Sequence, residues 1–147
     1  MNTQNFELPS FVDDYIFNKL GAKYSPDFEK FNKNLDHAHE DVLKYLGTYF
    51  PRSFTESCLI FNNIFAHKFI FNHYRKQDEV NILDIGSGTG GNLLGLLYSF
   101  IEQFGANYNF NIFVVDGNQD ALRILNKIVQ KFQLKYNLRI SVSVNYI

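Results

Sequence analysis

A glycine-rich turn that follows an apolar run carries the residue types best suited to ligand chemistry in this chain. Residues 80–91 read Val-Asn-Ile-Leu-Asp-Ile-Gly-Ser-Gly-Thr-Gly-Gly, a pattern typical of a buried strand, a turn and the start of a helix. Glycine lets a ligand approach the backbone, and a helix N-terminus offers free N–H groups. The segment therefore predicts a site for a nucleotide-type cofactor, with the candidate residues Asp84, Gly86, Ser87, Gly88 and Gly90.

A second apolar run ends in an acid at the matching place. Residues 110–116 end in Asp116, and Gly117 and Asn118 follow before another helical pattern. An acid at the end of the second strand of a nucleotide-binding sheet can accept hydrogen bonds from ribose hydroxyls. Asp116, Gly117 and Asn118 are therefore the second group of candidate cofactor-binding residues.

The two motifs together resemble class I S-adenosylmethionine-dependent methyltransferases over about residues 80 to 145. The resemblance rests on Asp84-x-Gly86-x-Gly88-x-Gly90 and on the acid and turn that begin at Asp116. It implies that S-adenosylmethionine is the cofactor, with Asp84 and the Gly86–Gly90 loop at its methionine end. It also implies that Asp116 binds the ribose and that Gly117 and Asn118 lie beside the adenosine.

Two other functions fit parts of the same pattern. Gly86, Gly88 and Gly91 have the spacing G-x-G-x-x-G of an NAD(P)-binding oxidoreductase domain. An acid at position 84 argues against that cofactor, because a carboxylate would repel a pyrophosphate at close range. The third hypothesis is a non-catalytic interaction module that keeps the fold without the activity.

Composition and charge limit the class of protein. The 147 residues are 46% hydrophobic with a net charge of −1, so there is no overall electrostatic case for nucleic-acid binding. The single cysteine, Cys58, excludes an intramolecular disulfide and fits a reducing compartment. No apolar run approaches the roughly 20 residues of a membrane span. We therefore expect a cytoplasmic protein with no membrane partner.

The spacing of apolar residues predicts an α/β fold in two regions. Residues 1–78 form an N-terminal helical cap, and residues 79–147 form the first half (βαβαβ) of a Rossmann-like parallel sheet. In the second region we expect strands at 80–85, 110–116 and 138–146, with helices at 91–104 and 119–136. The third strand alternates on one face only, which suits the edge of the sheet.

The helical region contains three predicted helices. Ser10 caps the first, which runs to about Leu20. The second runs from Pro26 to Leu46 and ends at Gly47. Pro51 breaks the chain, and a capping box of Ser53 and Glu56 opens the third. The third helix carries a wide apolar surface that we expect to be buried, formed by Leu59, Ile60, Ile64, Phe65, Phe69, Ile70 and Tyr74.

A complete sheet of the family that this chain resembles has seven strands, and this sequence supplies three. We therefore expect a truncated or partial chain that carries the cofactor-binding half. A split gene product and a homodimer that completes the sheet are the alternatives, and in each case strand one has a free edge. No catalytic residue can be named, and the methyl acceptor remains open among a small molecule, RNA and protein.

Four other features suggest chemistry and have a simpler interpretation. His37 and His39 point to opposite sides of a helix, so we expect no metal site. Cys58 is more easily explained as a packed thiol than as a nucleophile. Arg52 fits either a surface position or a pair with a cofactor carboxylate. A stripe of basic residues is more easily explained as the solvent-exposed face of a helix than as an RNA-binding face; it is formed by Arg123, Lys127, Lys131 and Lys135.

Overall fold

The computed structural model describes residues 7–26 and 39–147. Its centre is a parallel sheet of three strands in the order β1-β2-β3, formed by Glu79–Ile85, Asn109–Asp116 and Arg139–Tyr146. Helix α5 (Gly91–Phe104) connects the first two strands, and α6 (Gln119–Tyr136) connects the second pair. The predicted α/β class, the βαβαβ order and the edge position of the third strand are confirmed. Each strand lies within one or two residues of its predicted bounds.

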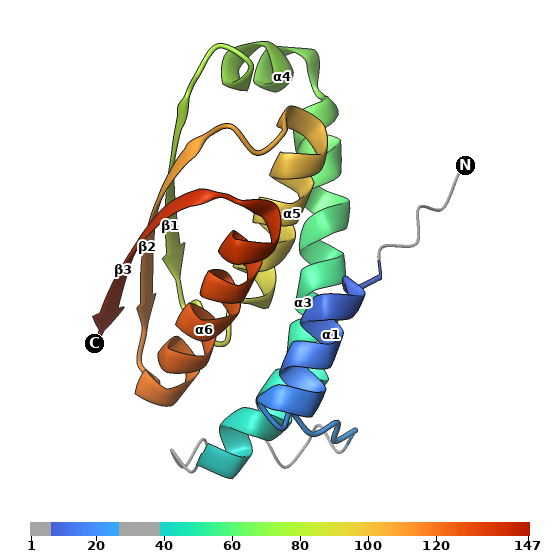
Figure 1. Ribbon diagram of the computed structural model, residues 1–147, viewed down its shortest axis with the longest axis vertical. Helices are drawn as coiled ribbons and strands as arrows, with labels where there is room; N and C mark the ends of the chain where they lie inside the picture. Colours follow the sequence, from blue (N-terminus) through green and yellow to red (C-terminus); the bar gives the residue numbers. More distant parts are fainter. Residues whose placement is uncertain (1–6, 27–38) are drawn as a thin grey trace.

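Both connecting helices pack on one face of the sheet (Figure 1). The side chains of Ile82 and Ile112 point to this face and are buried, as is Val114. The opposite face has no covering element among the described residues, and Leu83, Ile85 and Phe113 are exposed there. Parallel sheets are commonly covered on both faces. β1 pairs only with β2 in the described chain, so the free edge expected for the first strand is also confirmed.

The described elements of the helical region are α1 (Ser10–Asp14), a π-helical turn η1 (Tyr15–Lys19), α3 (His39–Ala66) and α4 (Lys68–Tyr74). Helices α1 and α3 lie outside the α5–α6 layer, whereas α4 lies at one end of the molecule, between the end of α3 and the start of β1 (Figure 1). Val12 and Ile16 join a hydrophobic core that extends to Leu138. Residues of both sequence regions therefore share one core. In the described part of the chain, no helix combines the length and the hydropathy that a membrane crossing needs.

Two glycines of α5 bring α3 very close to it. A Cβ on Gly95 would lie 2.5 Å from the carbonyl oxygen of Phe54, and one on Gly91 would lie 2.8 Å from that of Phe50. The hydroxyl of Ser57 donates a 2.7 Å hydrogen bond to the carbonyl of Asn92 across this contact. The backbones of the two helices are therefore in close contact, which fixes α3 relative to the start of α5.

Several predicted helix boundaries are wrong. Ser10 is not the cap, because Pro9 holds that position and its carbonyl accepts the N–H groups of Val12 and Asp13. Gly47 does not end a helix: it lies inside α3, where a Cβ would meet the backbone of Lys23 at 2.5 Å. The predicted helix from Pro26 to Leu46 falls partly outside the described residues.

Pro51 does not break the helix either. α3, which is 28 residues long, continues through it to Ala66, so Ser53 and Glu56 are interior positions and form no capping box. Proline removes one helical N–H donor, at a cost of about 3 kcal/mol. Phe50 and Phe54, on either side of it, are fully buried, and this packing offsets the cost.

The third predicted helix divides into two elements. His67 has extended backbone angles and separates α3 from α4. The predicted burial of its whole apolar surface is wrong, since Leu59, Ile60 and Ile64 are 40–56% exposed and Phe69 is 73% exposed. Phe65 does enter the core, where its ring meets those of Phe100 and Phe104 at 5.5 Å.

Candidate functional site

The glycine loop and both acids meet at the carboxyl ends of β1 and β2. The loop is fixed to β2 by the N–H groups of Gly86 and Ser87, which donate to the carbonyl of Val115 at 2.8 and 3.2 Å. The Ser87 hydroxyl donates to the carbonyl of Asp84 at 2.7 Å. The turn then enters α5 through Gly90, the residue before the first helical position.

Asp116 closes the loop from the neighbouring strand. Its Oδ2 accepts the backbone N–H of Gly88 at 2.8 Å, and its Oδ1 accepts that of Asn118 at 2.8 Å. A carboxylate has about four acceptor sites, so two of them remain for a ligand. The structure therefore places a predicted ribose-binding acid against the predicted loop, held by two backbone donors.

Asp84 lies partly buried beside the same loop, and its Oδ2 is fully buried. Its Oδ2 has no hydrogen-bond partner among the described residues. Burial is the main cause that raises the pKa of Asp84; the charge of Asp116 also raises it, and Ser87 opposes the rise. A buried acceptor without a partner costs about 1–3 kcal/mol, so a donor supplied by a ligand would relieve a real deficit.

The loop leaves room for a ligand at its first glycine. Gly86 has φ +73°, and the position of a Cβ on it has no atom within 4 Å. Gly90 differs, because a Cβ there would lie 2.8 Å from Cγ of Leu125. Packing therefore excludes any side chain at position 90. Gly86 is consequently the position where the loop opens onto free space.

The two predicted residues after Asp116 have different surroundings. Asn118 caps α6, since its Oδ1 accepts the N–H of Ala121 at 3.0 Å. Gly117 is exposed, and a Cβ on it would lie 3.6 Å from the carbonyl oxygen of Ile147. Both residues border the site, and their contact with an adenosine stays a prediction.

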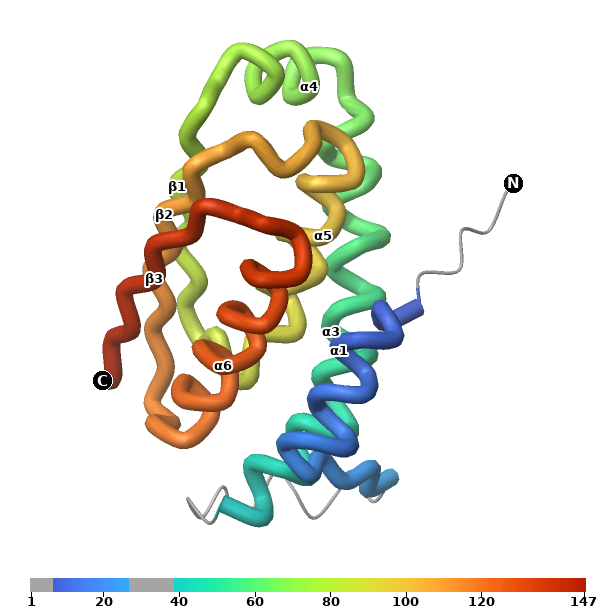
Figure 2. The backbone as a smooth tube through the Cα atoms, in the orientation of Figure 1, coloured from blue at the N-terminus to red at the C-terminus, as the bar shows by residue number. Residues whose placement is uncertain are grey.

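Tyr45 is a residue of this site that the sequence analysis missed. It lies in α3, whose first turns reach the end of the molecule where the strands finish (Figure 2). Its hydroxyl oxygen is 3.3 Å from the position of a Cβ on Gly88. No local signal identifies such a residue, because its place depends on how α3 packs against α5.

No protein-family model matches the chain, and no curated protein matches it. Among solved structures, a chain from Methanococcus maripaludis, described as a candidate S-adenosyl-L-methionine-dependent methyltransferase, aligns with 17% identity and a TM-score of 0.42. The alignment covers 76% of this chain and 44% of that chain. The present chain thus spans less than half the length of that protein.

The other candidate features have structural explanations. Cys58 is fully buried, and burial raises the pKa of its thiol to about 11, which confirms a packed thiol. Lys131 lies over the ring of Tyr15 at 5.8 Å and Lys135 over that of Phe11 at 5.6 Å, so half of the basic stripe covers aromatic side chains. Arg52 Nε donates to Oε1 of Glu56 at 2.7 Å.

No group of three or more metal-ligating side chains occurs among the described residues. His37 lies outside them, and His39 Nδ1 is 3.6 Å from Oδ2 of Asp120. That contact joins the start of α3 to the start of α6.

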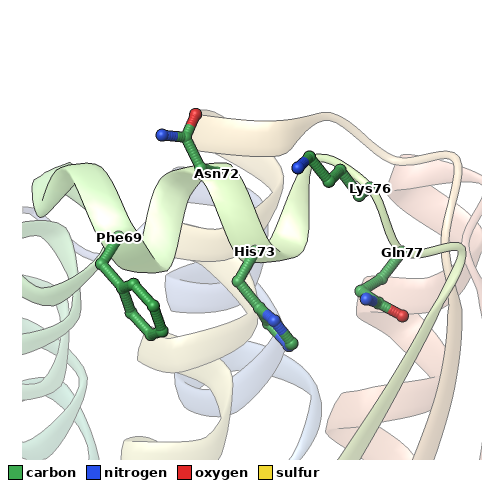
Figure 3. Close-up of a pocket in the computed structure, with 5 residues that line it drawn as sticks. All are labelled: Phe69, Asn72, His73, Lys76 and Gln77. Atoms are coloured by element: carbon green, nitrogen blue, oxygen red, sulfur yellow. The ribbon is translucent and has the colours of Figure 1, made fainter.

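Two surface hollows of the described chain lie away from the glycine loop. One is lined by Phe69, Asn72, His73, Lys76 and Gln77 (Figure 3). These residues belong to α4 and the segment after it, at the opposite end of β1 from the glycine loop. A second hollow, which includes Arg52, lies between the first helical segment and the middle of α3. Neither includes a residue of the glycine loop or either acid, so we assign the site from the loop geometry and the two acids.

Proposed function

We propose that this chain binds S-adenosylmethionine at the Gly86–Gly90 loop and serves as the cofactor-binding part of a methyltransferase. The observation that carries the proposal is the buried, unpartnered Oδ2 of Asp84 beside a loop that opens at Gly86. Such a site needs a ligand with a hydrogen-bond donor and favours a positive charge.

The charge of the site distinguishes two kinds of cofactor. An amino acid that also carries a sulfonium brings an ammonium donor and positive charge, both of which a buried carboxylate favours. A dinucleotide brings a pyrophosphate, which Asp84 and Asp116 would repel, although the N-terminus of α5 would attract it. The two carboxylates together outweigh the partial positive charge of one helix N-terminus, so the site favours the cationic ligand.

Asp116 would hold the ribose. Its two backbone bonds fix both carboxylate oxygens, so the remaining lone pairs point in set directions. Ribose hydroxyls are the donors that match them. Because the same carboxylate holds Gly88, a ligand bound there would also be fixed relative to the loop.

When bound, the cofactor supplies an electrophilic methyl group on a sulfonium sulfur, which an acceptor nucleophile takes up by direct displacement. The contribution of this chain is to bind and orient, and positioning alone lowers such barriers substantially. The proposal names no catalytic base and no acceptor.

Calorimetric titration with S-adenosylhomocysteine and with NADH tests the proposal. We expect micromolar binding of S-adenosylhomocysteine and no heat from NADH. Asp84→Asn should weaken the first ligand by about tenfold or more, because a charged hydrogen bond is lost. Asp78→Asn, which changes an exposed acid at the other end of β1, should leave binding within twofold.

Two results would contradict the proposal. Binding of NADH that tolerates Asp84→Asn would indicate a nicotinamide-binding domain. Absence of binding by either ligand would leave the glycine turn as a structural feature.

A further inference from the structure

Tyr45 brings the helical region into the ligand site. Its hydroxyl oxygen and two ring carbons lie 3.3, 3.4 and 3.7 Å from the position of a Cβ on Gly88. Its ring stacks on that of Tyr49, with centroids 4.8 Å apart and planes inclined by 24°. Because Tyr49 lies one turn further along α3, this stacking holds the Tyr45 phenol over the loop.

The hydroxyl of Tyr45 is a hydrogen-bond donor in acidic surroundings. Burial raises the pKa of Tyr45, and the charges of Asp116 and Tyr49 raise it further, so the phenol stays protonated at neutral pH. Asp116 already accepts two backbone N–H groups. Among the described residues, no hydrogen bond to the Tyr45 hydroxyl is present, so its donor is available to a ligand.

The ligand of the proposed function carries a carboxylate, which needs donors. Asp84 and Asp116 can only accept when ionised and would repel it. Loop N–H groups are donors, but that of Gly88 is taken by Asp116 and that of Gly86 by Val115. The Tyr45 hydroxyl, 3.3 Å from the position of a Cβ on Gly88, is therefore a donor next to the loop that can meet a carboxylate.

We propose that Tyr45 is a positioning residue of this site, and that its hydroxyl donates a hydrogen bond to the amino-acid carboxylate of the ligand. The inference rests on the proposed function and adds to it: α3 contributes directly to recognition, and the amino-acid part of the ligand lies between Asp84 and Tyr45.

A pair of ligands separates this contact from general packing. 5′-Methylthioadenosine has the same nucleoside and a thioether but no amino-acid group. By calorimetry, Tyr45→Phe should weaken S-adenosylhomocysteine by about tenfold, the cost of one charged hydrogen bond, and 5′-methylthioadenosine by less than twofold. Tyr45→Ala, which also removes the ring, should weaken both ligands.

Arg52→Ala is the matched control. Arg52 lies two helical turns from Tyr45, about 10 Å along α3, and carries a guanidinium donor that could meet a carboxylate. Because Arg52 is engaged with Glu56, its loss should change neither ligand by more than twofold. The thermal midpoint of each variant, measured by circular dichroism, checks that the fold is retained.

Three results would overturn the inference: an unchanged affinity of Tyr45→Phe for S-adenosylhomocysteine, an equal loss for both ligands, or a loss in Arg52→Ala instead. Failure of the proposed function looks different. In that case the unmodified chain binds neither ligand, and both proposals fall together.

Discussion

Oδ2 of Asp116 accepts the backbone N–H of Gly88 at 2.8 Å and so joins the end of β2 to the loop after β1. This bond joins two residues that are 28 positions apart in the sequence. It fixes the loop before any ligand arrives, with Asp84 near the end of one strand and Asp116 at the end of the next. Preorganisation of this kind reduces the cost of ordering a site on binding.

We expect Asp84→Asn to increase stability while it weakens the ligand. The pKa of Asp84 is raised in the folded state from its ordinary value of 3.8, so the folded chain binds this proton more tightly than the unfolded chain. Wild-type stability should therefore fall as pH rises from about 4 through the raised pKa. The asparagine of the variant does not ionise, so the variant should not lose stability over this pH range. Its free energy of unfolding at pH 7 should exceed that of the wild type by up to about 1 kcal/mol, a small gain because Asp84 is only partly buried. Urea denaturation at pH 4 and pH 7 measures the difference, and an equal gain at both values would contradict it.

Gly86→Ala should abolish ligand binding at a modest cost in stability. Gly86 has φ +73°, so alanine is strained by about 1–2 kcal/mol, and its Cβ enters the open space of the site. Gly105→Ala is the control for binding, because Gly105 also has a positive φ (+85°) and free surroundings but lies at the far end of α5. With ψ −177°, Gly105 has a conformation that essentially only glycine adopts, so this variant should lose at least as much stability. Only Gly86→Ala should lose binding of S-adenosylhomocysteine. Equal binding by the two would place the ligand elsewhere.

Gly95→Ala should destabilise the α3–α5 contact. The added Cβ would lie 2.5 Å from a backbone oxygen of α3, which cannot move without displacing the helix. We expect a loss of about 1–3 kcal/mol in the free energy of unfolding. Gln103→Ala, at an exposed position of α5, should change the free energy of unfolding by no more than about 0.5 kcal/mol. A neutral Gly95→Ala would show that the two helices can separate freely.

Cys58 should be inert in the folded chain. Its pKa of about 11 leaves roughly one thiolate per thousand at pH 8, and the side chain is fully buried. Labelling with a chromogenic disulfide should be at least about a hundredfold slower than for a small free thiol, and complete at once in guanidinium. Rapid labelling without denaturant would mean that α3 opens away from α5.

The strands, their parallel order and the helices between them could be predicted because their signals are local. Apolar runs mark β1 and β2, and the glycines at positions 90 and 105 lie at the ends of α5. The grouping of Asp84, the loop and Asp116 follows from that order, since carboxyl ends of neighbouring parallel strands meet at one edge.

The errors share a physical cause, which is tertiary packing that local rules do not contain. Gly47 was predicted to end a helix, whereas it makes room for the backbone of Lys23. Pro51 was predicted to break one, whereas the burial of Phe50 and Phe54 keeps α3 continuous through it. Tyr45 could not be found, because its relation to Gly88 exists only once α3 lies against α5.

The most direct test of a ligand site at the glycine loop is an NMR titration of the ¹⁵N-labelled chain with S-adenosylhomocysteine. Glycine amides are well separated in such spectra, and this chain has nine glycines. We predict that the amides of Gly86, Gly88 and Gly117 shift on addition of ligand, while those of Gly21 and Gly105 do not. Shifts confined to other parts of the chain, or no shift at millimolar ligand, would contradict the account.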